Sequence, residues 1–305
     1  MKTNIIIDTD PGDDIDDILA IAFALQRPEL DVKAITTVTY GTRKRADIVW
    51  GLLETLDKTH IPVGAGMELP LRLYTEAEYA MMTDNGGYVL NHYSTTMSKA
   101  APCYDAVELI IETVSRHAGE IGIVTLGPLT NLAVALRKNP AIAGRISWIA
   151  SMGGEVNVYR AEHNVTWDSA SAEIVLASGI PLFMGTWDIT RQVIVTEQDC
   201  QLIKQQTSLM CRYLSACIDM WWPYKKLKPG PVMFDIAPVI WSFDKELYTT
   251  RPMALQVENA GRLTRGVTVP VPVLPGEASH VEVSFAVDAE SVKSMFMETI
   301  CGKEL

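Results

Sequence analysis

The chain has 305 residues, of which 48% are hydrophobic and 21% charged, and its formal net charge is -11. This composition is that of an ordinary globular protein and excludes long disordered tracts. The negative charge argues against nucleic acid as a partner, and no apolar stretch approaches the length of a transmembrane span, so we expect no membrane association.

The cysteines and the first residues bear on the compartment. The five cysteines are an odd set without a C-x-x-C pair, which is typical of reduced thiols rather than of a disulfide framework. Met1-Lys2-Thr3 leads straight into a short apolar run, so we expect no signal peptide. We therefore predict a cytoplasmic protein.

Strand and helix patterns alternate along the chain. Ile5 to Ile7 predict a first strand, and apolar residues at helical spacing from Ile18 to Leu25 predict a helix that Pro28 ends. The later strands are predicted over 32–38, 61–64, 121–126, 146–152 and 181–186, the helices over 43–56, 106–117, 171–177 and 196–220, and β-rich segments over 253–287. We expect one α/β domain over residues 1–305, with a mostly parallel, doubly wound sheet flanked by helices.

The densest chemical signal is the run from Asp8 to Asp17, which places six aspartates in ten positions directly after the first strand. A solvated loop that caps the following helix is one interpretation, but a cap needs only one or two acids. Like charges at this spacing repel strongly unless a cation or protons compensate them. Oxygen ligands alone are typical of Ca²⁺ or Mg²⁺ rather than of zinc.

Other polar residues also follow predicted strands. In a parallel sheet the carboxyl ends of the strands open on one edge, where α/β proteins bind their ligands. The segments expected to converge there are 8–17, 39–43, 127–131, 153–157 and 162–164, together with the late Asp235. Carboxylates and amides in such a cluster suit a ligand with several hydroxyl groups.

Five blocks in order over nearly the whole chain resemble the inosine-uridine-preferring nucleoside hydrolase family. The blocks are Asp8-Thr9-Asp10-Pro11-Gly12 with Asp16-Asp17, Thr125-Leu126-Gly127-Pro128-Leu129-Thr130-Asn131, Met152-Gly153-Gly154, Ala161-Glu162-His163-Asn164, and Asp235. The resemblance implies a Ca²⁺-dependent enzyme that splits the N-glycosidic bond of a ribonucleoside with water, giving free base and ribose. It also implies a homodimer or homotetramer.

The resemblance assigns roles to single residues. The implied metal ligands are Asp10, Asp17, Asp235 and the backbone carbonyl of Leu126. Asp10 would also act as the general base that takes a proton from the water bound to the cation. The implied substrate-binding set is Asp16, Thr42, Asn157, Glu162, Asn164 and Asp235, with Asp16 holding a ribose hydroxyl.

Three departures from the family pattern limit these assignments. The acidic loop is two residues longer than the commonest form, so Asp13 and Asp14 are extra and either could take a ligand place. The asparagine expected after the second strand is absent, and Thr42 is the nearest candidate for its role. Phe234 stands where several members have a histidine that protonates the leaving base.

Phenylalanine cannot donate a proton, so the departing base needs another acid, stabilisation by stacking, or an intrinsic tendency to leave. The candidates for the base pocket are Asp84, Asn85, His163, Trp222, Tyr224 and Phe234. Each has a structural alternative, such as core packing for Trp222 or a ring turned away from the site for His163. The pattern leaves the preferred base open.

Two other functions fit parts of the pattern. A haloacid-dehalogenase-like phosphatase also begins with an apolar strand and D-x-D, but Pro11 and the later blocks are not explained by it. A non-catalytic, Ca²⁺-dependent nucleoside- or ribose-binding protein would keep the sugar and metal residues and lack the acid, as Phe234 suggests. Phosphate release would identify the first, and ligand retention without turnover the second.

Overall fold

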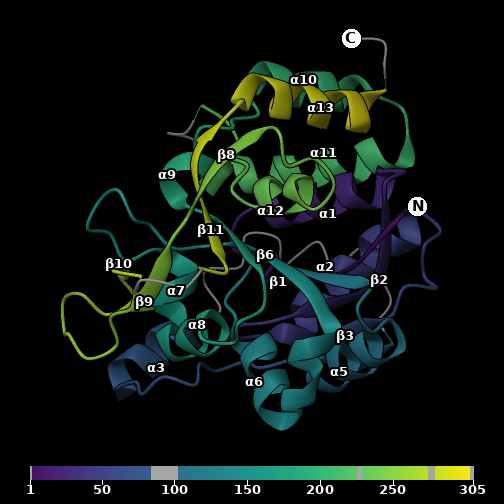
Figure 1. Cartoon of the computed structure of the whole chain (residues 1–305). Coiled ribbons are helices and arrows are strands. Elements are labelled where there is room, and N and C mark those ends of the chain that lie inside the picture. The colour runs from purple at the N-terminus through teal and green to yellow at the C-terminus, as the bar shows by residue number, and fades with distance from the viewer. Residues whose placement is uncertain (1, 84–101, 225–228, 274–278, 303–305) are drawn as a thin grey trace.

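A sheet of nine strands runs through the molecule, with layers of helices on both of its faces (Figure 1). The computed structural model describes residues 2–83, 102–224, 229–273 and 279–302. The strand order is β4-β3-β2-β1-β5-β6-β7-β11-β8, and every pair in this sheet is parallel except β8 against β11. The strands are β1 (Thr3–Thr9), β2 (Leu30–Thr37), β3 (Val63–Ala65), β4 (Cys103–Asp105), β5 (Ile121–Thr125), β6 (Ile146–Met152), β7 (Leu182–Gly185), β8 (Tyr248–Pro252) and β11 (Val281–Val287).

The helices divide between the two faces. One face carries α1 (Asp16–Gln26), α2 (Thr42–Thr55), α10 (Glu197–Gln205), α11 (Leu209–Trp221), α12 (Ile236–Trp241) and α13 (Ala289–Cys301). The other face carries α5 (Ala106–Arg116), α6 (Thr130–Lys138) and α8 (Ser169–Leu176). The shorter elements are α3 (Glu76–Met82), α7 (His163–Trp167), α9 (Trp187–Thr190), η2 (Pro140–Arg145), η3 (Trp222–Tyr224) and the antiparallel pair β9 (Ala254–Val257) and β10 (Thr268–Val271).

The two cores follow from the alternation of side chains along buried strands. In β1, Ile5 and Ile7 belong to the core under α1 and α13, whereas Ile6 belongs to the core under α5 and α6. Successive side chains of a strand point to opposite faces, so a continuous apolar run fills both cores. This confirms the predicted α/β fold with a mostly parallel sheet flanked by helices. Within the described ranges, no helix is long and apolar enough to cross a membrane.

The topology fixes where a ligand can bind. The chain passes from β1 to β2 on one side, and later returns to β5 on the other side of β1. A crevice outside the carboxyl ends of the strands is expected where the winding direction reverses in this way. The loops that follow β1 and β5 therefore lie at the switch point.

Some elements differ from the sequence predictions. The helices predicted over 196–220 are two in number, because Gln206 is extended and Ser208 begins a new helix by accepting a hydrogen bond from the Cys211 amide. The helix α6 and the three-residue strand β4 were not predicted. Such a short strand has almost no periodicity of its own and is defined by pairing with β3.

The Asp168 carboxylate joins three segments of the chain, which are residues 71–72, the start of α6 and the start of α8. Its buried carboxylate accepts hydrogen bonds from the amides of Leu71 (2.8 Å) and Arg72 (3.1 Å), and from the hydroxyl of Thr130 (2.8 Å). It also caps α8 by accepting from the amide and the hydroxyl of Ser171. Removing the carboxylate would leave these donors buried without partners.

We expect Asp168→Ala to lower the free energy of unfolding by on the order of 3 kcal/mol, because several buried donors lose their acceptor. The matched control is Asp288→Ala, which removes an exposed cap of α13 that also accepts from a serine amide and hydroxyl. Loss of an exposed cap costs about 1 kcal/mol. Equal losses in chemical denaturation would contradict the structural role given to Asp168.

Candidate active site

A cavity of about 280 Å³ opens at the carboxyl ends of β1, β5 and β6. The loops after these strands and the segment before α12 supply most of its wall. The lining residues are Asp10, Asp13, Asp14, Asp16, Asp17, Leu126, Met152, Arg160, Glu162, His163, Asn164, Trp187, Phe234 and Asp235. The switch point of the sheet is therefore hollow and strongly acidic.

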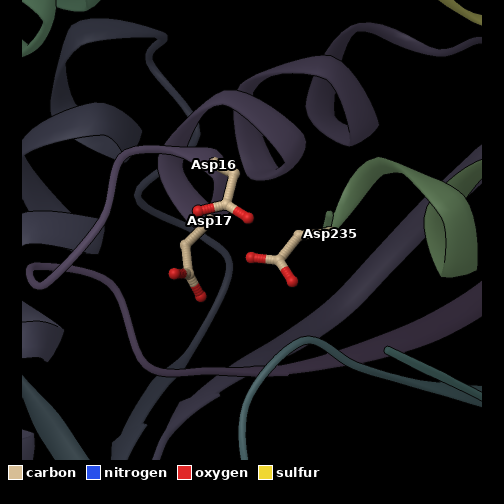
Figure 2. Close-up of side chains that lie close together, drawn as sticks. All are labelled: Asp16, Asp17 and Asp235. Carbon is tan, nitrogen blue, oxygen red and sulfur yellow. The ribbon is translucent and has the colours of Figure 1, made fainter. Parts of the chain in front are cut away.

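Three carboxylates meet at one wall of the cavity. Asp16 and Asp17 come from the first turn of α1, and Asp235 directly precedes α12; Figure 2 shows the three side chains turned toward one another. All three are buried, and one oxygen from each lies within 4.8 Å of the others. The amino end of α1 favours negative charge there, but buried charges still need a partner. An all-oxygen set of this kind could hold a hard cation.

Asp17 and Asp10 are fixed by the chain around them. Asp17 accepts hydrogen bonds from the Thr9 hydroxyl (2.5 Å) and the Asp10 amide (3.1 Å), which ties α1 back to the end of β1. Asp10 lies against Gly127, where an added Cβ would come within 2.5 Å of the Asp10 Oδ1. The loop after β5 thus approaches the Asp10 carboxylate so closely that residue 127 has room only for glycine.

Burial changes the protonation of these acids. Desolvation raises the pKa of Asp10 to about 7, with Arg45 opposing the shift and Asp13 adding to it. Desolvation and the neighbouring Asp10 raise the pKa of Asp17 to about 7 as well. The pKa values of Asp16 and Asp235 are raised well above their usual range by burial and by the other carboxylates. Near neutral pH the group therefore binds protons or a cation.

The two extra acids of the long loop each have a partner on a helix. Asp13 forms an ion pair of 2.9 Å with the buried Arg45 of α2, which also donates to the carbonyls of Asp10 and Pro11. Asp14 accepts a hydrogen bond of 2.6 Å from the indole of Trp221 at the end of α11. Both acids still line the cavity, so the longer loop remains part of the cavity wall.

Glu162 and Asn164 form the wall opposite α1. Glu162 caps α7 by accepting from the amides of Asn164 (2.9 Å) and Val165 (3.1 Å), and it also accepts from Gly154. The side-chain amide of Asn164 donates to the carbonyls of Leu126 (2.6 Å) and Met152. These contacts fix the ends of β5 and β6 relative to one another. They also bring Leu126, Glu162 and Asn164 into the same cavity as Asp10.

Other predicted site residues lie elsewhere. Thr42 is buried at the start of α2, where its hydroxyl donates to the Gly66 carbonyl. Asn157 donates its side-chain amide to Asp188, and Trp222 lines a separate hollow beside α10. The structure therefore does not bring Thr42, Asn157 or Trp222 to the cavity, and the side chains of Thr42 and Asn157 are bonded to residues far along the chain. Asp84, Asn85 and the Tyr224 side chain fall outside the described residues.

The structure adds three residues that the sequence analysis did not name for the site. They are Met152, Arg160 and Trp187, which line the cavity beside His163 and Phe234. Trp187 follows β7 directly, so the rule that polar and aromatic residues after strand ends reach the crevice could have identified it. Arg160 lies in an irregular loop and has no such signal.

The sheet topology and the acidic crevice define an α/β protein with a buried carboxylate cluster that could hold a hard cation. The family model described as inosine-uridine preferring nucleoside hydrolase matches residues 5–294. The chain belongs to this family of ribonucleoside hydrolases. Membership of this family excludes the phosphatase alternative.

Full-length relatives and structures agree with the assignment. The chain is 31% identical to a pyrimidine-specific ribonucleoside hydrolase RihA from Escherichia fergusonii, covering 98% of this chain and 99% of that protein. It superposes on a plant nucleoside hydrolase, PpNRh1, with a TM-score of 0.86 and 30% identity over 99% of both chains. A purine-preferring ribonucleoside hydrolase from Gardnerella vaginalis gives a TM-score of 0.84 and 25% identity over 98% of both chains.

The raised pKa values predict how a bound cation changes the pH dependence of the protein's stability. An unfolded aspartate has a pKa near 3.8, whereas Asp10 and Asp17 have pKa values of about 7 in the folded protein. Between these two pKa values, the folded protein without its cation binds more protons than the unfolded chain. These groups therefore make the free energy of unfolding fall as pH rises. A bound cation removes this penalty.

We therefore expect the difference in melting temperature between Ca²⁺-loaded and EDTA-treated protein to widen as pH rises through this interval. Thermal unfolding of both samples in the same buffers checks it. Taking the difference cancels titrations elsewhere in the chain. A gap that stays constant or narrows toward neutral pH would show that these carboxylates do not bind the ion.

The close contact of Gly127 with Asp10 gives a steric test. We expect Gly127→Ala to displace the Asp10 carboxylate and to lower ribose release by up to about 10²-fold, a loss typical of a misplaced reacting group. Gly144→Ala is the control, since a Cβ there meets nothing within 4 Å. Full activity of the Gly127 variant would mean that the position of Asp10 is not critical.

Proposed function

We propose that this protein hydrolyses the N-glycosidic bond of ribonucleosides to free base and ribose, and that it depends on Ca²⁺. The supporting observation is the convergence of two sets of residues in one cavity of a nucleoside hydrolase fold: the ligand candidates Asp10, Asp17, Asp235 and Leu126, and the sugar-binding candidates Asp16, Glu162 and Asn164. Three of these groups are carboxylates, which suit a hard cation. The assignment of Ca²⁺ itself comes from the family resemblance.

The residues would divide the reaction between them. Asp10, Asp17, Asp235 and the Leu126 carbonyl would hold the cation, which lowers the pKa of a water molecule bound to it. Asp10 accepts a proton from the attacking water. A bound cation favours the deprotonated form of Asp10, which is the form that can accept this proton.

The sugar would be held by groups on both walls. Asp16 accepts a hydrogen bond from a ribose hydroxyl, while Glu162 and Asn164 bind the remainder of the sugar from α7. Cleavage builds positive charge on the ribose ring, and nearby carboxylates and amide oxygens stabilise that charge as it forms. Thr42 and Asn157 are less suited to this role, because each is engaged outside the cavity.

The preferred base stays open. The RihA relative is described as pyrimidine-specific and the Gardnerella vaginalis protein as purine-preferring, so similar chains differ in this property. Phe234 and His163 are the base-pocket candidates whose described side chains line the cavity. We also propose a cytoplasmic homodimer or homotetramer, which light scattering on the purified protein can test.

The test is ribose release from a panel of purine and pyrimidine ribonucleosides, with and without a chelator that removes Ca²⁺. We expect turnover that the chelator abolishes and that added Ca²⁺ restores. Asp10→Asn should lower kcat by about 10²–10⁴-fold, because it removes the proton acceptor.

The control variant is Asp31→Asn, at the amino end of β2 and paired with Lys33 away from the cavity. It should retain the wild-type rate. Ca²⁺-dependent binding of a nucleoside without any turnover would replace this proposal with the binding-protein alternative. Turnover that survives the chelator would contradict the role of the ion.

A further inference from the structure

Trp187 is stacked between two arginines at the edge of the cavity. The Arg160 guanidinium carbon lies 3.9 Å from the centre of the indole ring, and that of Arg191 lies 4.4 Å from it. Arg160 and Trp187 line the cavity, whereas Arg191 does not. The same indole therefore holds one cation inside the site and one outside it.

This stack is built on segments that are fastened to each other. The buried Glu155 accepts hydrogen bonds from the amides of Asn157 (2.8 Å) and Asp188 (3.0 Å), which joins the loop after β6 to the start of α9. The side-chain amide of Asn157 also donates to the Asp188 carboxylate. The Thr268 hydroxyl of β10 accepts a hydrogen bond from the backbone amide of Glu155. These hydrogen bonds hold the loop that carries Arg160 and the helix that carries Trp187 together as one wall of the cavity.

The Arg160 guanidinium keeps its hydrogen-bonding edge available. Among the described residues its side chain makes a ring contact with Trp187, and it forms no ion pair with a carboxylate of the cavity. The donors of Arg45, by contrast, are bonded to Asp13 and to three backbone carbonyls. Stacking on an aromatic face orients a guanidinium while leaving its N–H groups free in the plane.

The remaining lining indicates which part of a nucleoside meets this wall. Once the acids, Asn164 and the Leu126 carbonyl are assigned to cation and sugar, five side chains are left. They are Met152, Arg160, His163, Trp187 and Phe234. A flat, conjugated base with carbonyl oxygens suits apolar and aromatic surfaces flanked by a cation. A ribose suits the carboxylate wall.

We propose that Arg160 is a catalytic residue that stabilises the departing base as an anion. This inference rests on the proposed hydrolase function. The bond between C1′ and the base nitrogen breaks, and its electron pair stays on the base. The water oxygen bonds to C1′ and gives its proton to Asp10, while the base anion later takes a proton from solvent.

The charge on such an anion is shared with a ring carbonyl oxygen, where a guanidinium donates two hydrogen bonds. Arg160 does not lose its proton near neutral pH, so it stabilises charge and does not act as an acid. This arrangement makes a proton donor at position 234 unnecessary. It also disfavours adenosine, whose base has no carbonyl oxygen.

The test compares Arg160→Gln on uridine and on p-nitrophenyl β-D-ribofuranoside, whose leaving phenolate needs little stabilisation. We expect kcat on uridine to fall by about 10²-fold, as when a donor to a developing anion is removed. The nitrophenyl riboside should lose only a few-fold. Arg160→Lys, which keeps the charge, should recover part of the loss on uridine.

The matched control is Arg191→Gln, which removes the cation on the other face of the same indole and should leave both substrates at the wild-type rate. If Arg160→Gln lowers both substrates equally, Arg160 binds the sugar and the inference is wrong, although the hydrolase stands. An unchanged rate on uridine overturns it as well. If the wild-type protein cleaves neither substrate, the hydrolase proposal itself fails first.

Discussion

Burying several carboxylates at one end of a parallel sheet is the constraint on which the rest of this structure depends. Removing a carboxylate from water costs several kcal/mol unless other groups replace the solvent. Here the replacement comes from the amino end of α1, the Thr9 hydroxyl, the Asp10 amide and the Arg45 guanidinium. Each compensating group belongs to an element whose place in the fold is thereby set.

The local part of this arrangement is readable in the sequence. The run Ile5 to Ile7 gives a buried strand, and the aspartates after it must lie at the sheet's carboxyl edge once the strand is parallel. The strands β1, β2, β5 and β6 and the acidic wall were predicted for this reason. They depend on patterns that a few neighbouring residues carry by themselves.

The rest depends on contacts between distant segments. Arg45 belongs to a short run of basic residues, yet it is buried because Asp13 and the backbone of the acidic loop supply its acceptors. Thr42 and Asn157 have residue types suited to a sugar, but a carbonyl and a carboxylate close by occupy them. Arg160 reaches the cavity only because Glu155 and Asp188 join its loop to α9. None of these pairings has a local sequence signal.

Two walls of the cavity belong to different parts of the molecule. The acidic wall is anchored to α1, α2 and α11 through Arg45 and Trp221. The wall formed by Arg160 and Trp187 is anchored to the loop after β6, to α9 and to β10. Because the two sets of anchors share no residue, mutations can accumulate in one wall without disturbing the other. A lineage with this scaffold can therefore diverge along one wall of the cavity while the acidic wall stays under unbroken selection.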